Sequence, residues 1–187
     1  MRAAAEWGAR GPRLGLAEWT VLAVVCERPV HGFAIAALTA SDGDLGRVWQ
    51  IPRPVVYRAI GRLVDAGLIS ADAVEAAGGP PRTVYAATTT GRERAMAWLA
   101  EPVPHVRELR SEFLLKLAVL HRRDADPAEL VAAQRAVLEP IVAALRAEPG
   151  GPEPGGPEPG GADTFDRMLA AWRRVSAEAA LAFLDEL

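Results

Sequence analysis

Apolar residues at helical spacing open the patterned part of the chain, over residues 14–27. They recur every three or four positions, as a helix with one buried face requires; they are Leu16, Trp19, Leu22, Ala23 and Cys26. The dipeptide Arg28-Pro29 should end this helix, because proline disfavours helical backbone in the residue before it. The first thirteen residues lack such a pattern, and we expect them to form a flexible arm.

A second and a third helix follow. The second is expected over 31–40, with core contacts from Phe33, Ile35 and Leu38. Ser41–Asp44 is a turn cluster, and a short extended piece over 48–51 leads to the third helix. That helix should run from Arg53 to about Ala66. Its apolar face consists of Val56, Ile60, Leu63 and Val64.

Proline and glycine residues mark the boundaries of the third helix and of the elements after it. Pro54 suits a first helical turn, and Gly67 is a stop signal. Two strand-like runs, 68–74 and 83–87, flank a Gly/Pro-rich loop at 76–81. The order helix–helix–helix–strand–loop–strand is the plan of a winged helix-turn-helix. Trp19 and Trp49 are expected in its core.

Helical patterns dominate the rest of the chain. Thr88, Thr89 and Thr90 are N-cap candidates for a helix through Leu99. Another helix fits 106–121, with one face formed by Val106, Leu109, Phe113, Leu117 and Leu120. A further helix opens at Asp126-Pro127. Its aligned positions are Leu130, Gln134, Val137, Ile141 and Leu145.

A repetitive segment separates the last helix from the others. Residues 148–161 read EPGGPEPGGPEPGG, which offers no apolar side chain to a core. We interpret it as a flexible connector, rather than as a ligand for a proline-reading domain. The helix expected over 162–187 carries a heptad-like stripe of Phe165, Met168, Leu169, Trp172, Val175, Ala179 and Phe183. Such a stripe must dock, either on its own domain or on a second subunit.

These patterns predict a mainly α fold with a small β-wing. The expected organisation has three parts. They are a flexible N-terminal arm over 1–13, a winged helix-turn-helix DNA-binding domain over 14–101, and a C-terminal helical dimerisation region over 102–187 that contains the linker 148–161.

Charge is unevenly distributed along this acidic chain of net charge −3. Residues 1–90 carry nine arginines and eight acids, whereas residues 91–187 carry twelve basic and sixteen acidic residues. Net charge therefore does not predict nucleic-acid binding, and only a local patch would. Of the twenty-one basic residues, twenty are arginine, which is typical of a GC-rich genome.

Several site classes find no support in the sequence. A single cysteine, Cys26, excludes an internal disulfide and a C-x-x-C metal site; we interpret it as a structural thiol, with a redox sensor as the alternative. The three histidines have no convincing catalytic partners, and a packing or capping role is expected for His31. No catalytic motif appears, so an enzyme, a metal and a cofactor are not expected. No apolar run is long enough to span a bilayer, so we expect a cytoplasmic protein.

The local patch lies on the third helix. Opposite its apolar face lie Arg53, Arg58 and Arg62, with Tyr57 at the edge. In a helix-turn-helix the N-terminal half of this helix enters the major groove, where arginine pairs with guanine or clamps phosphate. The alternative is an ordinary solvated face, but the helices before it and the wing after it favour DNA. Arg82 and Thr83, beside the Gly/Pro loop, would lie where a wing meets the DNA backbone.

The sequence resembles the PadR family of bacterial transcriptional regulators from about Leu14 to Leu120. The residues that carry the resemblance are His31-Gly32-Phe33, Trp49, Val56-Tyr57, Arg62-Leu63, Gly67-Leu68-Ile69, Pro81-Arg82-Thr83-Val84-Tyr85, Thr90-Gly91-Arg92, Trp98-Leu99 and Glu112–Leu117. Many members read Ser-Pro-Gly-Thr-Ile-Tyr-Pro where this chain has residues 52–58, so base preference does not carry over. Here Pro54 and Val55 replace polar or small residues, and Val55 could meet a thymine methyl.

The resemblance implies a homodimeric repressor that binds a near-palindromic double-stranded DNA operator, with the C-terminal helices of two subunits packed together. In some relatives a phenolic or aromatic compound releases the DNA. Here Trp7, Trp98, Phe113 and Trp172 are candidates for lining such a pocket, although they also suit an ordinary core. The alternative function is a winged module that binds protein and not DNA.

Overall fold

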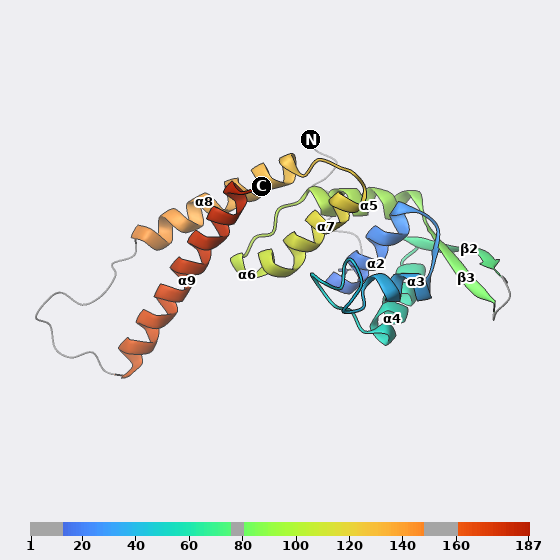
Figure 1. The fold of residues 1–187 in the computed structure, drawn as a ribbon, viewed down its shortest axis with the longest axis horizontal. Coiled ribbons are helices and arrows are strands. Elements are labelled where there is room, and N and C mark those ends of the chain that lie inside the picture. Colours follow the sequence, from blue (N-terminus) through green and yellow to red (C-terminus); the bar gives the residue numbers. More distant parts are fainter. Residues whose placement is uncertain (1–12, 76–80, 148–160) are drawn as a thin grey trace, which may run out of the picture. The chain divides into compact units, whose positions relative to one another are not determined.

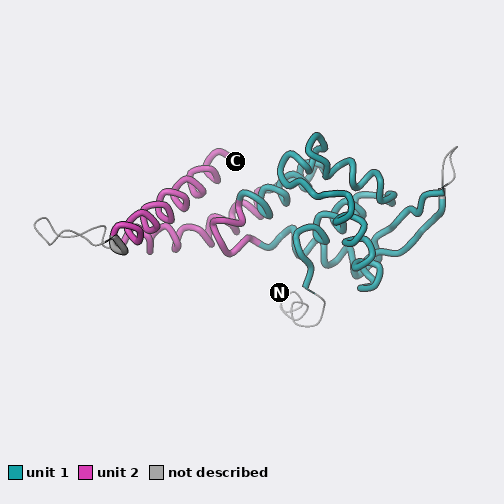
Figure 2. Tube along the Cα trace, turned by 90° about the horizontal axis from the view of Figure 1, so that it is seen from below, with its two compact units in different colours: residues 1–101, 110–127 teal, residues 102–109, 128–187 magenta. Residues whose placement is uncertain are grey.

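The computed structural model describes residues 13–75, 81–147 and 161–187, which form parts of two compact units (Figure 2). The first unit comprises residues 1–101 and 110–127, and the second comprises 102–109 and 128–187. The expected N-terminal arm, wing loop and repetitive connector fall mainly outside the described residues. Because compactness does not test whether a part folds or functions alone, the three-part division stays a prediction.

The three predicted helices of the winged plan are present in the first unit (Figure 1). They are α2 (Leu16–Glu27), α3 (Gly32–Leu38) and α4 (Arg53–Asp65). The middle of α2 is buried on all sides over Val21–Val25, and α4, α5, α7 and β3 all contact this helix. A helix that is apolar all round is stable only inside a core, so α2 is the centre of this unit.

A three-stranded antiparallel sheet completes the wing. Its strands are β1 (Val30–His31), β2 (Ile69–Glu75) and β3 (Arg82–Ala87), in the spatial order β1-β3-β2. Strands β2 and β3 extend away from the helices of their unit as a hairpin (Figure 1). The sequence pattern missed β1, because a two-residue strand has no detectable period.

Helix α4 ends as its stop signal predicts. Gly67 has a φ of +66°, the left-handed conformation that glycine adopts at little cost. The Leu68 N–H donates to the Leu63 carbonyl at 2.9 Å, and the Gly67 N–H donates to Val64 at 2.9 Å. This pair of bonds is the Schellman motif, and it turns the chain directly into β2.

Three apolar side chains lie outside the core that the pattern assigned to them. Phe33 is 48% exposed, Trp49 41% and Val64 41%. Residues 48 and 49 are in a turn and not an extended piece, with both N–H groups donating to Leu45. The fully buried Leu45 anchors that turn, so Trp49 lies on the surface.

The next helices follow the pattern with one irregularity. Helix α5 (Thr89–Ala100) is capped by Thr88, whose hydroxyl accepts from the Gly91 N–H at 3.0 Å. The helix predicted over 106–121 consists of α6 (Val106–Glu108), a π-helical turn (Leu109–Phe113) and α7 (Leu114–Arg122). The core positions after the π turn are Leu115, Lys116 and Val119, while Leu117 and Leu120 are half-buried.

Arg122 fastens α7 to two other parts of the first unit. Its guanidinium donates twice to the Glu27 carboxylate, at 3.0 and 2.8 Å, and once to Asp44 at 2.8 Å. The bond to Glu27 raises the pKa of Arg122 further above its ordinary value. The end of α2, the loop after α3 and the end of α7 are thus held by one side chain.

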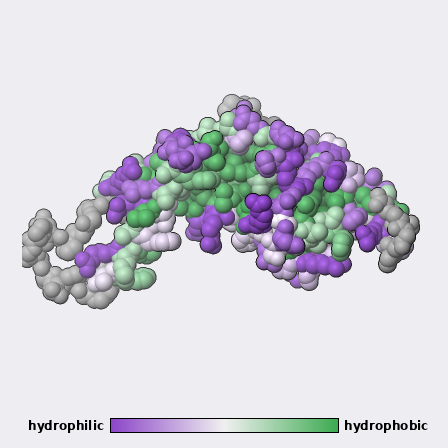
Figure 3. Space-filling view, in the orientation of Figure 1, coloured by the Kyte–Doolittle hydropathy of each residue, from purple (hydrophilic) through white to green (hydrophobic). Residues whose placement is uncertain are grey.

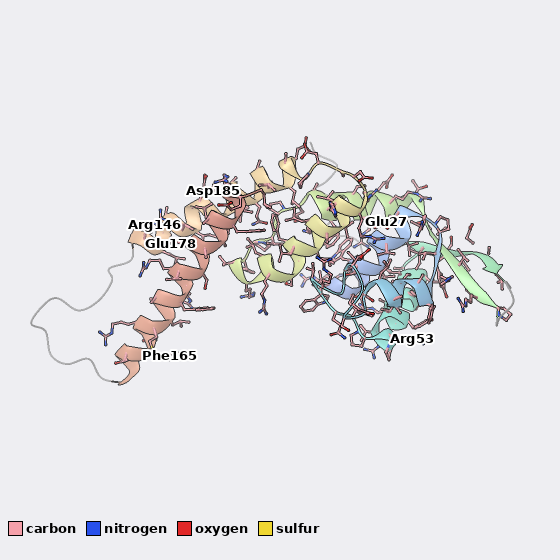
Figure 4. The ribbon with its side chains drawn as sticks, in the orientation of Figure 1. Glu27, Arg53, Arg146, Phe165, Glu178 and Asp185 are labelled. Atoms are coloured by element: carbon pink, nitrogen blue, oxygen red, sulfur yellow. The ribbon has the colours of Figure 1, made fainter. Side chains whose placement is uncertain are left out.

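The second unit contains α8 (Ala128–Ala147) and α9 (Gly161–Asp185), which lie side by side (Figures 1 and 2). The buried face of α8 consists of Leu130, Gln134, Leu138 and Val142, while Val137, Ile141 and Leu145 are half-buried. The Gln134 side chain makes two hydrogen bonds to the backbone of Val103. Its Oε1 accepts from the Val103 N–H at 2.8 Å, and its Nε2 donates to the Val103 carbonyl at 2.9 Å. Arg146 donates to Glu178 at 2.8 Å, which joins the two helices (Figure 4).

Two further features are absent from the described ranges. None of the helices there has both the length and the hydropathy that crossing a bilayer requires. The same residues contain no cluster of three or more His, Cys, Asp or Glu side chains placed to hold a metal ion.

Two glycines provide a matched test of this packing. A Cβ at Gly91 would lie 2.0 Å from the Leu68 carbonyl oxygen, whereas a Cβ at Gly61 would meet nothing within 4 Å. We expect Gly91→Ala to lower the free energy of unfolding by about 3 kcal/mol, because α5 must move off the sheet. Gly61→Ala should raise it by about 0.5–1 kcal/mol. Urea denaturation of both variants measures this; a stable Gly91→Ala variant would contradict the close approach.

Candidate nucleic-acid interface

The exposed side of α4 displays the predicted basic residues. Arg53, Pro54, Tyr57 and Arg58 are all exposed, while Val55 is half-buried against the core. Hydrophilic residues gather over this helix in the space-filling view (Figure 3). On the opposite side Val56, Ile60 and Leu63 are buried, as predicted. The helix therefore has the two faces that a recognition helix needs, one packed and one free.

Arg53 begins α4 and lies against two aromatic rings. Its guanidinium carbon is 5.3 Å from the centre of the Phe33 ring and 5.7 Å from that of Tyr57. Figure 4 shows Arg53 on the outer side of the first unit, beside α4. Distances below 6 Å to a ring centre are those of cation–π contacts, which hold the guanidinium in place.

The wing contributes a second arginine to the same ring. The Arg82 guanidinium carbon is 5.2 Å from the centre of the Phe33 ring. Between α4, the start of α3 and the wing lies an open cleft of about 400 Å³. The residues that line it are His31, Gly32, Phe33, Arg53, Tyr57, Pro81, Arg82, Thr83 and Tyr85. Four expected interface residues thus share one cleft: Arg53, Tyr57, Arg82 and Thr83.

The start of α3 gives the cleft its shape. The His31 Nδ1 accepts from the Ala34 N–H at 3.0 Å, which confirms the capping role expected for this histidine. A Cβ at position 32 would lie 2.9 Å from the Tyr57 ring, so only glycine lets that ring lie so close. The His-Gly-Phe sequence therefore fixes the ring of Tyr57 and presents the ring of Phe33.

Arg62 differs from the other arginines of α4, because it is bonded to its own protein. Its Nη1 donates to the Glu18 carboxylate at 2.7 Å, and that carboxylate also accepts from the Gly15 N–H at 2.8 Å. The Glu18 side chain is only 9% exposed. Arg62 thereby ties α4 to the start of α2. Its expected DNA contact is untested and stays a prediction.

The residues expected to line an effector pocket lie in different parts of the structure. Trp98 and Phe113 are buried in the first unit, whereas Trp172 lies in the second unit and is 70% exposed. Trp7 lies outside the described residues. The pocket itself therefore stays a prediction.

Trp98 belongs to a polar and aromatic cluster that the sequence did not indicate. Its ring stacks on Trp19 at 5.4 Å between centres, and its Nε1 donates to Glu112 at 2.7 Å. The buried Lys116 pairs with the same carboxylate at 3.1 Å and donates to the Glu101 carbonyl at 2.7 Å. Apart from the Lys116–Glu112 pair, these contacts join residues 14 or more positions apart in the sequence, so spacing alone could not reveal them.

Cys26 has the surroundings of a structural thiol. Burial raises its pKa, although the nearby positive charges of Arg123 and Arg92 act in the opposite direction. A raised pKa keeps the thiol protonated and poorly nucleophilic near neutral pH. This environment favours the structural interpretation over the redox sensor.

The bond between Arg62 and Glu18 predicts a contrast within α4. We expect Arg62→Ala to lower the free energy of unfolding by about 1–2 kcal/mol, because it leaves a buried carboxylate without its cation. Arg58→Ala should leave stability nearly unchanged, since Arg58 is exposed. Urea denaturation compares the two. Equal stability of both variants would show that the ion pair contributes nothing.

Part of this chain is similar to a known family of proteins. Residues 21–97 match the model of the transcriptional regulator PadR-like family. The "Probable transcriptional regulator Rv1176c" of Mycobacterium tuberculosis is 28% identical over 94 residues, which are 50% of this chain and 49% of that protein. The match with that relative thus spans about half of its length. These relatives are regulators and not enzymes.

Solved structures show a more distant likeness. Bacillus subtilis PadR in complex with operator DNA has 16% identity and a TM-score of 0.47, over 94% of this chain and 97% of that one. The same protein in complex with p-coumaric acid has 16% identity and a TM-score of 0.43, over 92% and 96%. The smu.1604c protein of Streptococcus mutans UA159 has 15% identity and a TM-score of 0.42, over 90% and 96%.

Proposed function

We propose that the chain is a DNA-binding repressor, because residues 21–97 match the model of the transcriptional regulator PadR-like family. It acts in the cytoplasm as a homodimer, on a near-palindromic operator. Helix α4 enters the major groove and the wing follows the adjacent backbone. A small aromatic or phenolic compound releases the DNA.

One observation carries the DNA-binding part of the proposal. Arginines from two separate elements, Arg53 and Arg58 on α4 and Arg82 on β3, are exposed on the surface that the winged plan turns toward DNA. Among the described side chains none of these three arginines has a carboxylate within salt-bridge distance. Exposed arginines without an acidic partner among the described side chains form a surface suited to phosphate and to guanine edges.

The dimer part rests on the exposed face of α9. Ala177 and Leu184 are buried, whereas four large apolar residues on another face are more than half exposed: Phe165, Met168, Trp172 and Val175. Their spacing of three, four and three residues is that of a helix seam. A single isolated apolar side chain on a surface is common, but an ordered row of four suits a partner helix. A second copy of the chain is that partner.

The DNA-binding part of the proposal predicts the affinity of the protein for DNA. Titration against a duplex from the promoter of its own gene should show at least about 1,000-fold preference over a scrambled duplex, with log K falling linearly with log salt. Arg58→Ala should weaken binding by about 10-fold or more and change the sequence preference. Arg173→Ala, an exposed arginine of α9, is the control and should bind normally.

Two other results of the same titration are informative. If no duplex binds even at low salt, the DNA-binding proposal fails and the protein-interaction alternative gains support. Added p-coumaric acid should lower the operator affinity of the wild-type protein; an unchanged affinity would count against release by this phenolic acid.

The dimer part of the proposal predicts the oligomeric state of variants of α9. Trp172→Asp should halve the mass measured by light scattering, because a charge in the centre of the α9 seam cannot be buried in a dimer. Arg173→Asp changes the next residue and should leave the mass unchanged. A dimeric Trp172→Asp variant would show that the seam is not the interface. Deleting 163–187 is a coarser test, since it would also uncover the buried side of α8.

A further inference from the structure

Phe33 is an exposed aromatic residue that two arginines approach from different elements. Its ring is 48% exposed, although the sequence pattern places it on the core side of its helix. The guanidinium carbons of Arg53 and Arg82 are 5.3 and 5.2 Å from its centre. Half of a large apolar side chain is therefore in solvent, where it contributes little to folding. The ring contacts the guanidinium groups of Arg53 and Arg82.

The position of this ring is determined by the backbone around it. Residue 33 follows the His31 cap at the start of α3, and His31 itself pairs with Val84 in the sheet. Arg82 lies two residues before Val84 on β3. The ring is thus held at the start of α3, directly after β1, the wing arginine is on the neighbouring strand β3, and Arg53 is at the start of α4. Three elements converge on one cleft.

The cleft holds two positive charges and no described negative charge. Two cations share one ring without an anion among the described lining side chains, which contain no carboxylate. The negative face of an aromatic ring offsets part of their repulsion. The first turn of α4 adds the partial positive charge of a helix N-terminus. An anion between the two guanidinium groups would complete the arrangement, and the cleft of about 400 Å³ has room for one phosphate group.

We propose that Phe33 is a positioning residue that holds Arg53 and Arg82 as a preformed clamp for one phosphate of the DNA backbone. The proposal rests on the proposed function and deepens it, because it assigns the group of the DNA that this cleft binds. Phe33 itself donates no hydrogen bond. It acts by keeping two flexible side chains close to the geometry of the bound state, which lowers the entropy lost on binding.

The kind of contact favours phosphate over a base edge. A guanidinium that lies with its face toward a ring keeps its N–H groups available around its edge, where phosphate oxygens accept them bidentately. Phosphates are present at every step of the duplex. The clamp should therefore add affinity for any sequence, while Arg58, which has no such ring, remains available for base contacts.

The test replaces the ring and keeps the volume. Phe33→Leu should weaken binding to an operator duplex and to a random duplex by the same factor, about 10-fold, and should reduce the salt slope by about one. Phe33→Tyr keeps the ring and should bind like the wild type. Trp49→Leu is the matched control, since Trp49 is 41% exposed in the same unit and makes no cation–π contact with a described side chain, and it should bind normally.

Two results with these variants would overturn the clamp while leaving DNA binding intact. One is wild-type affinity for Phe33→Leu on both duplexes. The other is a loss that differs between the duplexes, because it would show that the ring helps to read bases.

A second measurement separates the clamp from the proposed function. Inorganic pyrophosphate is titrated into the full-length protein, and the side-chain Nε–H signals of Arg53 and Arg82 are followed by NMR. Both signals should shift together in the wild type and much less in Phe33→Leu. If no duplex binds but these signals shift, the proposed function fails and the anion site stands. If they do not shift, the clamp is wrong.

Discussion

Helix α2 constrains the first unit, because it is buried on almost every side and the other elements take their positions from it. Val21–Val25 are at most 2% exposed, and α4, α5, α7 and β3 pack around them. The outer face of α4 is free only because its inner face is fixed to this helix. The Glu18–Arg62 pair adds a polar attachment at one end of α2, and the Glu27–Arg122 pair adds another at the opposite end.

Local signals made the course of the chain predictable. Pro54 and Gly67 bracket α4 to within a residue of its observed bounds, and Thr88 caps α5 as expected. The exposed or buried state of single residues was less predictable. Phe33 and Ile35 are both apolar and only two positions apart, yet one is half exposed and the other is fully buried. The hydrophobicity of a residue gives the free-energy cost of exposing its side chain to water. It does not show whether neighbouring arginines make cation–π contacts with an exposed ring.

Contacts between residues far apart in the sequence also limited what the sequence could predict. Arg58 and Arg62 occupy the same face of α4 by spacing, but the partner of Arg62 is 44 residues earlier in the chain. No periodicity within α4 contains that information. The sequence pattern also did not predict the π turn at Leu109–Phe113, nor that Lys116 is buried while Leu117 is only half-buried. For the same reason the cluster around Trp98 was not expected, and a heptad stripe predicted α9 without showing which of its faces meets α8.

The arginines of this chain explain how an acidic protein can present a positive surface. Arginine serves two different purposes here, and the partner decides which. Arg62 and Arg122 are paired with Glu18, Glu27 and Asp44, so these acids and bases neutralise one another within the fold. Arg53 and Arg82 rest on an aromatic ring, which holds a guanidinium without cancelling its charge. The carboxylates of Glu18, Glu27 and Asp44 are paired elsewhere in the first unit, and the described side chains that line the cleft include no carboxylate. Local pairing therefore governs what this surface attracts, and net charge governs only the long-range field, which salt screens within about 10 Å.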